Sequence, residues 1–206
     1  AALWAPIYNH DLFEAMVENS VYVPGPEVAA IAAAARKFGV CVSMGISERS
    51  TVSVGCIWNS NVLIGESGEL LNHHRKLVPT FYEKLVWAGG DGQGLRVADT
   101  PFGRIGGLIC GENTNPLARF SLMAQAEQIH ISSWPPIWPT RKPTGGGNFD
   151  NVAANRTRAS AHSLEAKAFG IVCAGVMDKL MRDFLPDRDP KIAEVIDTTP
   201  RGVSMF

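Results

Sequence analysis

Long apolar runs and an excess of charge of one sign are both absent from this sequence of 206 residues. Its densest apolar run, residues 28–35, is mostly alanine and far shorter than the roughly 20 residues that cross a bilayer. Lys and Arg number 19 and Asp and Glu number 20, so the net charge is −1. The first ten residues have neither the basic region nor the apolar core of a signal peptide. We therefore expect no nucleic-acid partner and no membrane partner.

Cysteine is scarce, and no Cys-x-x-Cys pair or Cys/His cluster occurs. The four cysteines are Cys41, Cys56, Cys110 and Cys173. A secreted disulfide scaffold is shorter and denser in cysteine, so the sequence favours reduced thiols in the cytoplasm. The only histidine pair is His73–His74, and adjacent strand residues point to opposite faces. We therefore expect no metal site.

No repeat, low-complexity tract or linker divides the chain, which predicts one domain over residues 1–206. Apolar patterning and turn residues predict helices over 28–38, 116–126 and 151–169, and strands over 40–46, 70–77, 128–133 and 171–175. Hairpins are predicted between 52–58 and 62–65, across 59–61, and between 94–99 and 104–110. Because hairpins are mixed with alternating helices and strands, the pattern indicates a mixed sheet with helices on one face, in the α/β or α+β range.

The segment around Cys110 is the most informative for chemistry. A short apolar strand ends at this thiol, and the following residues 113–116 read as a helix start. A thiol that faces a helix N-terminus is expected to have a lowered pKa. Gly111 lets a substrate approach the backbone, and its N–H is a candidate oxyanion donor. The alternative is that Cys110 is a small buried apolar residue.

A second candidate segment carries Lys76 and, seven residues later, Glu83. A lysine beside a carboxylate can stabilise a developing oxyanion, although this spacing alone is most often solvated charge. A thiol nucleophile commonly uses a histidine base. His130 lies in the middle of an expected strand, and His162 lies in an expected helix, where a solvated or capping role is favoured. A Cys–His protease arrangement is therefore weakly supported.

Together these segments resemble the nitrilase branch of the carbon–nitrogen hydrolase (nitrilase) superfamily. The resemblance rests on HRKLVPTFYEK (74–84), WAGGDG (87–92) and TPFGRIGGLICGENTNPLARFSLMAQAEQIHISSWPPIWP (100–139), and extends weakly to 21–27 and 158–175. It implies a four-layer αββα sandwich and a Glu–Lys–Cys triad, with Cys110 as the nucleophile and Lys76 as the lysine. Glu83 matches a second glutamate that positions these two, and Gly111 matches the backbone oxyanion donor. The resemblance also implies no metal or organic cofactor, and a homodimer or larger homo-oligomer.

The implied reaction converts a nitrile to a carboxylic acid and ammonia through a thioimidate and a thioester on Cys110. Thr80, Trp87, Trp134 and Pro135 are the candidate substrate-binding residues, although both tryptophans could equally be ordinary packing residues. One alternative is an amidase or carbamoylase of the same superfamily. Another is a non-catalytic fragment or assembly module.

The sequence also departs from the family pattern. The family's general base is a glutamate in a Phe-Pro-Glu-like motif, and these 206 residues contain no such motif. Glu48 follows a strand but does not match it. Many nitrilases have Trp-Glu-His after the cysteine, where this chain has Gly111-Glu112-Asn113. There is no starting Met, and the family continues beyond the match to residue 206, so we expect a domain that is partial at both ends.

Overall fold

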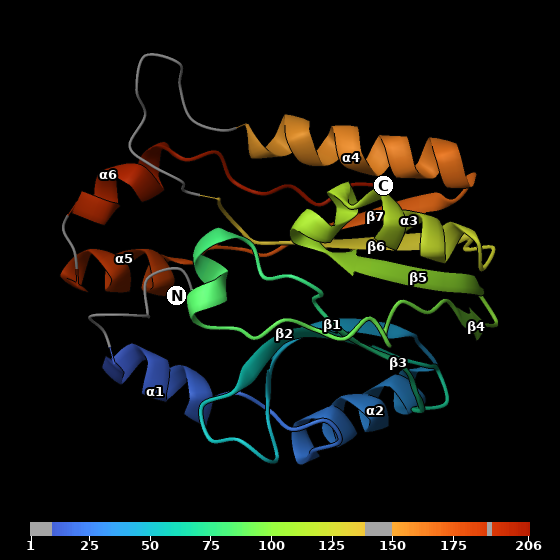
Figure 1. Cartoon of the computed structure of the whole chain (residues 1–206), viewed down its shortest axis with the longest axis horizontal. Coiled ribbons are helices and arrows are strands. Elements are labelled where there is room, and N and C mark those ends of the chain that lie inside the picture. Colours follow the sequence, from blue (N-terminus) through green and yellow to red (C-terminus); the bar gives the residue numbers. More distant parts are fainter. Residues whose placement is uncertain (1–9, 139–149, 189–190) are drawn as a thin grey trace.

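The computed structural model describes residues 10–138, 150–188 and 191–206, which form two β-sheets between outer helices (Figure 1). The first sheet is antiparallel and has the order β1 (Val42–Arg49), β2 (Ile57–Ile64), β3 (Leu70–Arg75). The second has the order β4 (Ala98–Thr100), β5 (Gly103–Ile109), β6 (Ile129–Trp134), β7 (Phe169–Ala174). Its last three strands are parallel, while β4 pairs antiparallel with β5.

Helices cover the outer face of each sheet, so the layers run helix, sheet, sheet, helix (Figure 1). α1 (His10–Glu18) and α2 (Pro26–Phe38) lie on the side of the first sheet, and α3 (Pro116–Met123) and α4 (Asn151–Ala166) cover the second. α5 (Lys179–Arg188) and α6 (Lys191–Thr198) contact each other at one end. This is the four-layer arrangement that the resemblance implies. The mixed sheet that the pattern indicated is present as the second sheet, but the pattern did not indicate that a second, antiparallel sheet packs against it.

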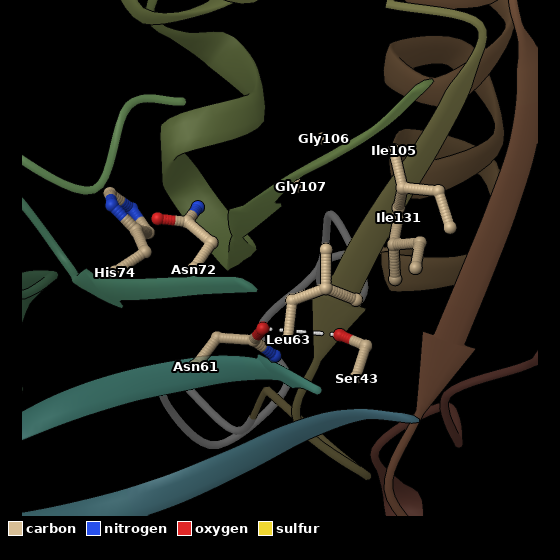
Figure 2. Close-up of a pocket in the computed structure, with 9 residues that line it drawn as sticks. All are labelled: Ser43, Asn61, Leu63, Asn72, His74, Ile105, Gly106, Gly107 and Ile131. Atoms are coloured by element: carbon tan, nitrogen blue, oxygen red, sulfur yellow. Dashed lines mark hydrogen bonds between the residues drawn. The ribbon is translucent and has the colours of Figure 1, made fainter. Parts of the chain in front are cut away.

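The two sheets pack face to face through apolar side chains. Leu63 of the first sheet clusters with Ala98 and Ile105 of the second. Beside this cluster lies a cavity of about 10 Å³, close to the volume that holds one water molecule. Figure 2 shows that it also has polar walls, where Ser43 Oγ donates to Asn61 Oδ1 at 3.1 Å. The space between the sheets is therefore not purely apolar.

Helix α2 forms where local sequence predicts it. Pro26 occupies its first turn, alanines fill its body, and Gly39 ends it with a left-handed φ of 62°. Its buried face, Val28 and Ala35, packs against Val62 and Ile64 of β2. No helix among the described residues is long and apolar enough to span a bilayer.

The predicted hairpin across residues 59–61 is wrong, because β2 continues through them. Their polar side chains have partners within the sheet. Ser60 is fully buried, and its hydroxyl donates to Glu48 Oε2 at 2.6 Å. Asn61 accepts from Ser43. The turn lies earlier, between β1 and β2.

Other boundaries also moved. α4 ends at Ala166, since Lys167 takes the left-handed conformation (φ 56°), and β7 already begins at Phe169. The pattern did not predict α1, α5, α6 or two short 3₁₀ helices, η1 (Phe81–Leu85) and η2 (Cys110–Thr114). Both 3₁₀ helices hold candidate site residues.

Candidate active site

Cys110 stands where strand β5 changes into helix η2. Its backbone has a φ of 53°, in the left-handed region that residues with a Cβ rarely adopt. The residue is buried, at 8% exposure. A strained residue at the end of a buried strand needs support from its neighbours.

Lys76 and Glu83 form an ion pair beside this turn. Lys76, directly after β3, is 1% exposed, and its Nζ donates to Glu83 Oε2 at 2.5 Å. The same carboxylate oxygen accepts from the backbone N–H of Thr80 at 2.6 Å. The pair is therefore buried, and the solvated alternative for this spacing does not hold.

Glu112 links the two strand ends that carry the lysine and the cysteine. Its carboxylate accepts from the backbone N–H of Leu77 at 2.7 Å and of Ile109 at 2.8 Å. It also meets His74 Nε2 at 2.9 Å. All these partners flank Lys76 or Cys110, so Glu112 fixes the spacing between them.

The glycine-rich segment 87–92 packs against the backbone of Lys76. Gly90 N donates to the carbonyl of Lys76 at 2.8 Å. A Cβ on Gly90 would lie 2.3 Å from the carbonyl oxygen of Arg75. Only glycine permits this close approach.

Burial raises the pKa of the Cys110 thiol. The positive charge of Lys76 lowers this pKa and the negative charge of Glu83 raises it. The Gly111 N–H and Arg158 both lower it, because they favour the thiolate. The net direction is upward, so the lowered pKa expected from a helix N-terminus is wrong. The first N–H groups of α3, at Leu117 and Ala118, instead donate to Asn115 Oδ1.

Cys110 and Gly111 open onto a cavity of about 90 Å³. Three of the expected substrate-binding residues line it: Thr80, Trp134 and Pro135. The fourth, Trp87, does not. Its indole donates to Ser47 Oγ at 3.1 Å, and its ring packs against a core cluster that includes Ile57. Trp87 therefore serves packing of the first sheet.

Sequence reasoning missed three lining residues: Trp138, Asn151 and Arg158. Asn151 and Arg158 are seven residues apart on α4, two helical turns, and so share one face. That spacing was a usable signal. Trp134 Nε1 and Asn151 Nδ2 are buried donors with no hydrogen-bond partner within the described ranges. The Arg158 guanidinium lies 5.4 Å from the Trp134 ring. Three residues that carry hydrogen-bond donors therefore line the cavity: Trp134, Asn151 and Arg158.

A wider groove adjoins the cavity, with a volume of about 320 Å³. Thr80 and Gly111 line both spaces. The groove continues along Val78, Pro79 and Phe81. A molecule that reaches Cys110 could thus extend into the groove.

Glu48 does not line the cavity at Cys110 and forms hydrogen bonds within the first sheet. It is 2% exposed, and it accepts hydrogen bonds from Ser60, His73 and Arg75. Burial would raise its pKa, but hydrogen bonds from His73, Arg75 and Ser60 lower the pKa to about 2. This carboxylate is a structural anchor of the first sheet.

Glu127, His130 and His162 form a group of metal-ligating type in the described part of the chain, with ligand atoms within 4.8 Å of one another. Glu127 bonds His130 Nδ1 at 2.8 Å and His162 Nε2 at 2.7 Å. Two ligands of one tetrahedral Zn²⁺, each about 2.0–2.1 Å from the ion, stand about 3.3 Å apart. The group is therefore arranged as a hydrogen-bond network. His162, expected to be solvated, is 1% exposed.

The chain belongs to the carbon–nitrogen hydrolase family, whose model matches residues 3–205. It is 38% identical over 165 residues to a protein named nitrilase 3 from an unknown prokaryotic organism, which covers 79% of this chain and 46% of that protein. It is 35% identical over 180 residues to an arylacetonitrilase of Hypocrea virens, covering 86% of this chain and 53% of that protein. The chain thus spans about half the length of the curated relatives that it matches.

Solved structures share the fold. A carbon–nitrogen hydrolase from Helicobacter pylori G27 matches with a TM-score of 0.69 at 21% identity, over 87% of this chain and 59% of that one. An amidase from Nesterenkonia sp. matches with a TM-score of 0.57 at 15% identity, over 71% and 51%. Both neighbours confirm the two-sheet architecture with outer helices.

Proposed function

We propose that the protein carrying this chain hydrolyses a nitrile to a carboxylic acid and ammonia, with Cys110 as the nucleophile. The observation that carries the proposal is the buried Lys76–Glu83 ion pair beside a thiol held in a left-handed turn. Relatives named nitrilase and arylacetonitrilase support nitriles as the substrate class.

In the proposed mechanism, Cys110 Sγ attacks the nitrile carbon and gives a thioimidate. One water adds to the C=N carbon and ammonia leaves, which produces a thioester. A second water hydrolyses the thioester to the acid and frees the thiol. Lys76 and the Gly111 N–H stabilise the charge that develops on the substrate nitrogen and oxygen. Glu83 holds the lysine side chain in place through the hydrogen bond that its Oε2 accepts from Lys76 Nζ.

The raised pKa of the Cys110 thiol means that its proton must be taken up as attack occurs. The resemblance assigns this role to a glutamate in a motif that these 206 residues do not contain, so the mechanism names no residue of this chain as the general base. Metal or organic cofactors have no step in it.

The two adjoining spaces suggest how a substrate lies. The cavity of about 90 Å³ fits a cyano group with few further atoms, against Trp134 and Pro135. The remainder would extend past Thr80 into the groove of about 320 Å³. Small nitriles and arylaliphatic nitriles both fit this division.

Ammonia release and product analysis on matched nitriles and amides test the proposal. They are measured on the natural polypeptide that carries this chain and on the 206 residues alone, with Cys110→Ala as the control. Acid formed from nitrile, and lost in the variant, supports a nitrilase. Turnover of amide alone supports the amidase or carbamoylase alternative. Large assemblies without turnover of either substrate support a non-catalytic module.

We also propose a homo-oligomer in a reducing compartment, the cytoplasm. All four cysteines are free thiols, which suits that compartment. Exposed apolar side chains on α3 and α4 offer a surface for a second copy.

A further inference from the structure

We propose that Glu127, His130 and Asn113 form a buried hydrogen-bonded chain that positions the Cys110 nucleophile. The effect on turnover rests on the proposed function, while the effect on the thiol itself does not. The chain starts beside α4, runs through β6 and ends on the Cys110 carbonyl.

Asn113 makes the contact with the nucleophile. Its Nδ2 donates to the carbonyl of Leu108 at 3.2 Å and to the carbonyl of Cys110 at 3.0 Å. Because both partners are carbonyl oxygens, the orientation of the amide is fixed. The amide thus joins the end of β5 to the strained residue and holds the left-handed turn closed.

The oxygen of the Asn113 amide shows which nitrogen of His130 carries a proton. Asn113 Oδ1 lies 2.9 Å from Ser132 Oγ and 2.8 Å from His130 Nε2. An amide oxygen only accepts, so His130 Nε2 must carry a hydrogen. The imidazole is therefore the donor that sets the plane of the amide.

Glu127 in turn holds both histidines. Arg119 Nε donates to His162 Nδ1 at 3.4 Å, so His162 presents its protonated Nε2 to Glu127 Oε2 at 2.7 Å. Glu127 Oε1 lies 2.8 Å from His130 Nδ1. With Nε2 already protonated, a proton must also lie between His130 Nδ1 and Glu127, as imidazolium–carboxylate or as its neutral equivalent.

The three residues of this hydrogen-bonded chain are buried, which indicates that they position the nucleophile and do not contact substrate. Asn113, His130 and Glu127 are 1–4% exposed, and none lines the cavity at Cys110. A buried ionic group seldom stabilises a core more than apolar side chains of the same volume. A buried polar chain that ends on the carbonyl of the proposed nucleophile is therefore explained better by a positioning role than by a gain in stability.

The hydrogen-bonded chain predicts that two substitutions of Glu127 have different effects. In Glu127→Gln, the amide oxygen can accept from His162 Nε2 while its NH₂ donates to His130 Nδ1, so every hydrogen bond is kept with neutral groups. In Glu127→Leu, both bonds are lost at similar volume. Ser132→Ala is the matched control, since it removes the other donor to Asn113 Oδ1 and leaves the chain intact.

The experiment measures the rate at which iodoacetamide alkylates Cys110, by peptide mass spectrometry across pH, together with kcat and KM for a nitrile. We expect Glu127→Leu to lower the plateau alkylation rate and kcat by at least about 10-fold, with a smaller change in KM. Glu127→Gln and Ser132→Ala should stay within about 3-fold of the unchanged protein. Circular dichroism confirms that each variant is folded at the assay temperature.

Equal alkylation plateaus in Glu127→Leu and the unchanged protein would overturn the proposal, and so would an equal loss in Ser132→Ala. If Glu127→Leu does not fold, Asn113→Asp replaces it, because this variant puts an oxygen against the Cys110 carbonyl at unchanged size. Retained alkylation in Asn113→Asp overturns the proposal as well. Alkylation needs no nitrile turnover, so a protein that hydrolyses no nitrile still gives a result.

Discussion

Cys110 shows how far a local pattern can predict the position of a candidate nucleophile. The apolar strand and the Gly111 that follows predicted a thiol at a strand end, and the structure places it there. The pattern left burial of this thiol open as an alternative, because burial depends on side chains from distant segments. Burial outweighs the charge of Lys76, and the pKa of the thiol rises.

Substitutions of Lys76 and Glu83 should shift the pKa of the Cys110 thiol in opposite directions and lower turnover alike. Lys76→Gln should raise the pKa of Cys110 further, because it removes the charge that lowers it. Glu83→Gln should lower this pKa, because it removes a charge that raises it. Both variants should lose at least about 100-fold in kcat, since oxyanion stabilisation or lysine placement is lost.

The pH dependence of Cys110 alkylation gives the two thiol pKa values, and ammonia release gives turnover. Cys110→Ser serves as the inactive reference. A Glu83→Gln variant with unchanged turnover would contradict the role of Glu83 as a positioning residue.

A side chain at position 111 should clash with Thr80, and a second substitution at Thr80 should relieve the clash. A Cβ at this position would lie 3.0 Å from Thr80 Oγ1, closer than ordinary contact. Gly111→Ala should therefore lower kcat by about 10-fold, because the backbone donor beside Cys110 must shift.

Thr80→Ala removes the oxygen that the new methyl group meets. In the double variant, the alanine at 111 should cost less than it does with Thr80 present, as measured against Thr80→Ala alone. Strict additivity of the two effects would show that the contact with Thr80 is not the cause.

At the scale of elements, the main error of the sequence prediction was strand β2. Asn59, Ser60 and Asn61 have turn-forming side chains, and composition alone favours a loop. Within the sheet, however, Ser60 pairs with a buried carboxylate and Asn61 with a neighbouring strand. Tertiary partners decide such a segment. Helix α2 has its start and end marked locally by Pro26 and Gly39, so the same reasoning predicted it correctly.

The anchor at Glu48 predicts how the first sheet responds to acid. Its pKa of about 2 in the folded protein is below its ordinary value of 4.5. A lowered pKa contributes stability that is complete above pH 4.5 and is lost as pH falls toward 2. Glu48→Gln should therefore lower the free energy of unfolding by roughly 2–3 kcal/mol at pH 7.

Urea denaturation at pH 7 and at several values between pH 5 and about 2.5 checks this prediction. The gap between the unchanged protein and the variant should narrow as pH falls. Glu18→Gln, on the exposed side of α1, is the matched control and should change little. A gap that stays constant with pH would mean that the lost stability does not come from the charge of Glu48.

For the whole molecule, the layers followed from the resemblance and not from periodicity. Hydrophobic patterns indicate which faces are buried, but they do not say how many sheets share them. The site shows the same limit. Lys76, Glu83 and Cys110 lie in motifs that could be read. The spacing of Asn151 and Arg158 shows that they share a helix face, but that this face meets the cavity depends on the packing of α4 on the second sheet.

The outer layers predict where the contact of the proposed homo-oligomer lies. Leu117 and Phe120 on α3 and Leu164 on α4 are 66–77% exposed, an apolar surface unusual for a helix face that meets only water. An ion pair between Arg119 and Glu165 holds the two helices side by side.

Phe120→Asp should therefore give a smaller species in sedimentation velocity, because a charge would be buried at the contact. Phe38→Asp is the matched control, since Phe38 is 69% exposed at the end of α2, on the opposite outer layer.

The same shift in both variants would locate no interface and point to general destabilisation. An unchanged sedimentation coefficient in Phe120→Asp would leave α3 outside the contact. A shift in Phe120→Asp alone, with alkylation of Cys110 unchanged, would place the interface on the α3 and α4 layer and separate assembly from the chemistry of the site.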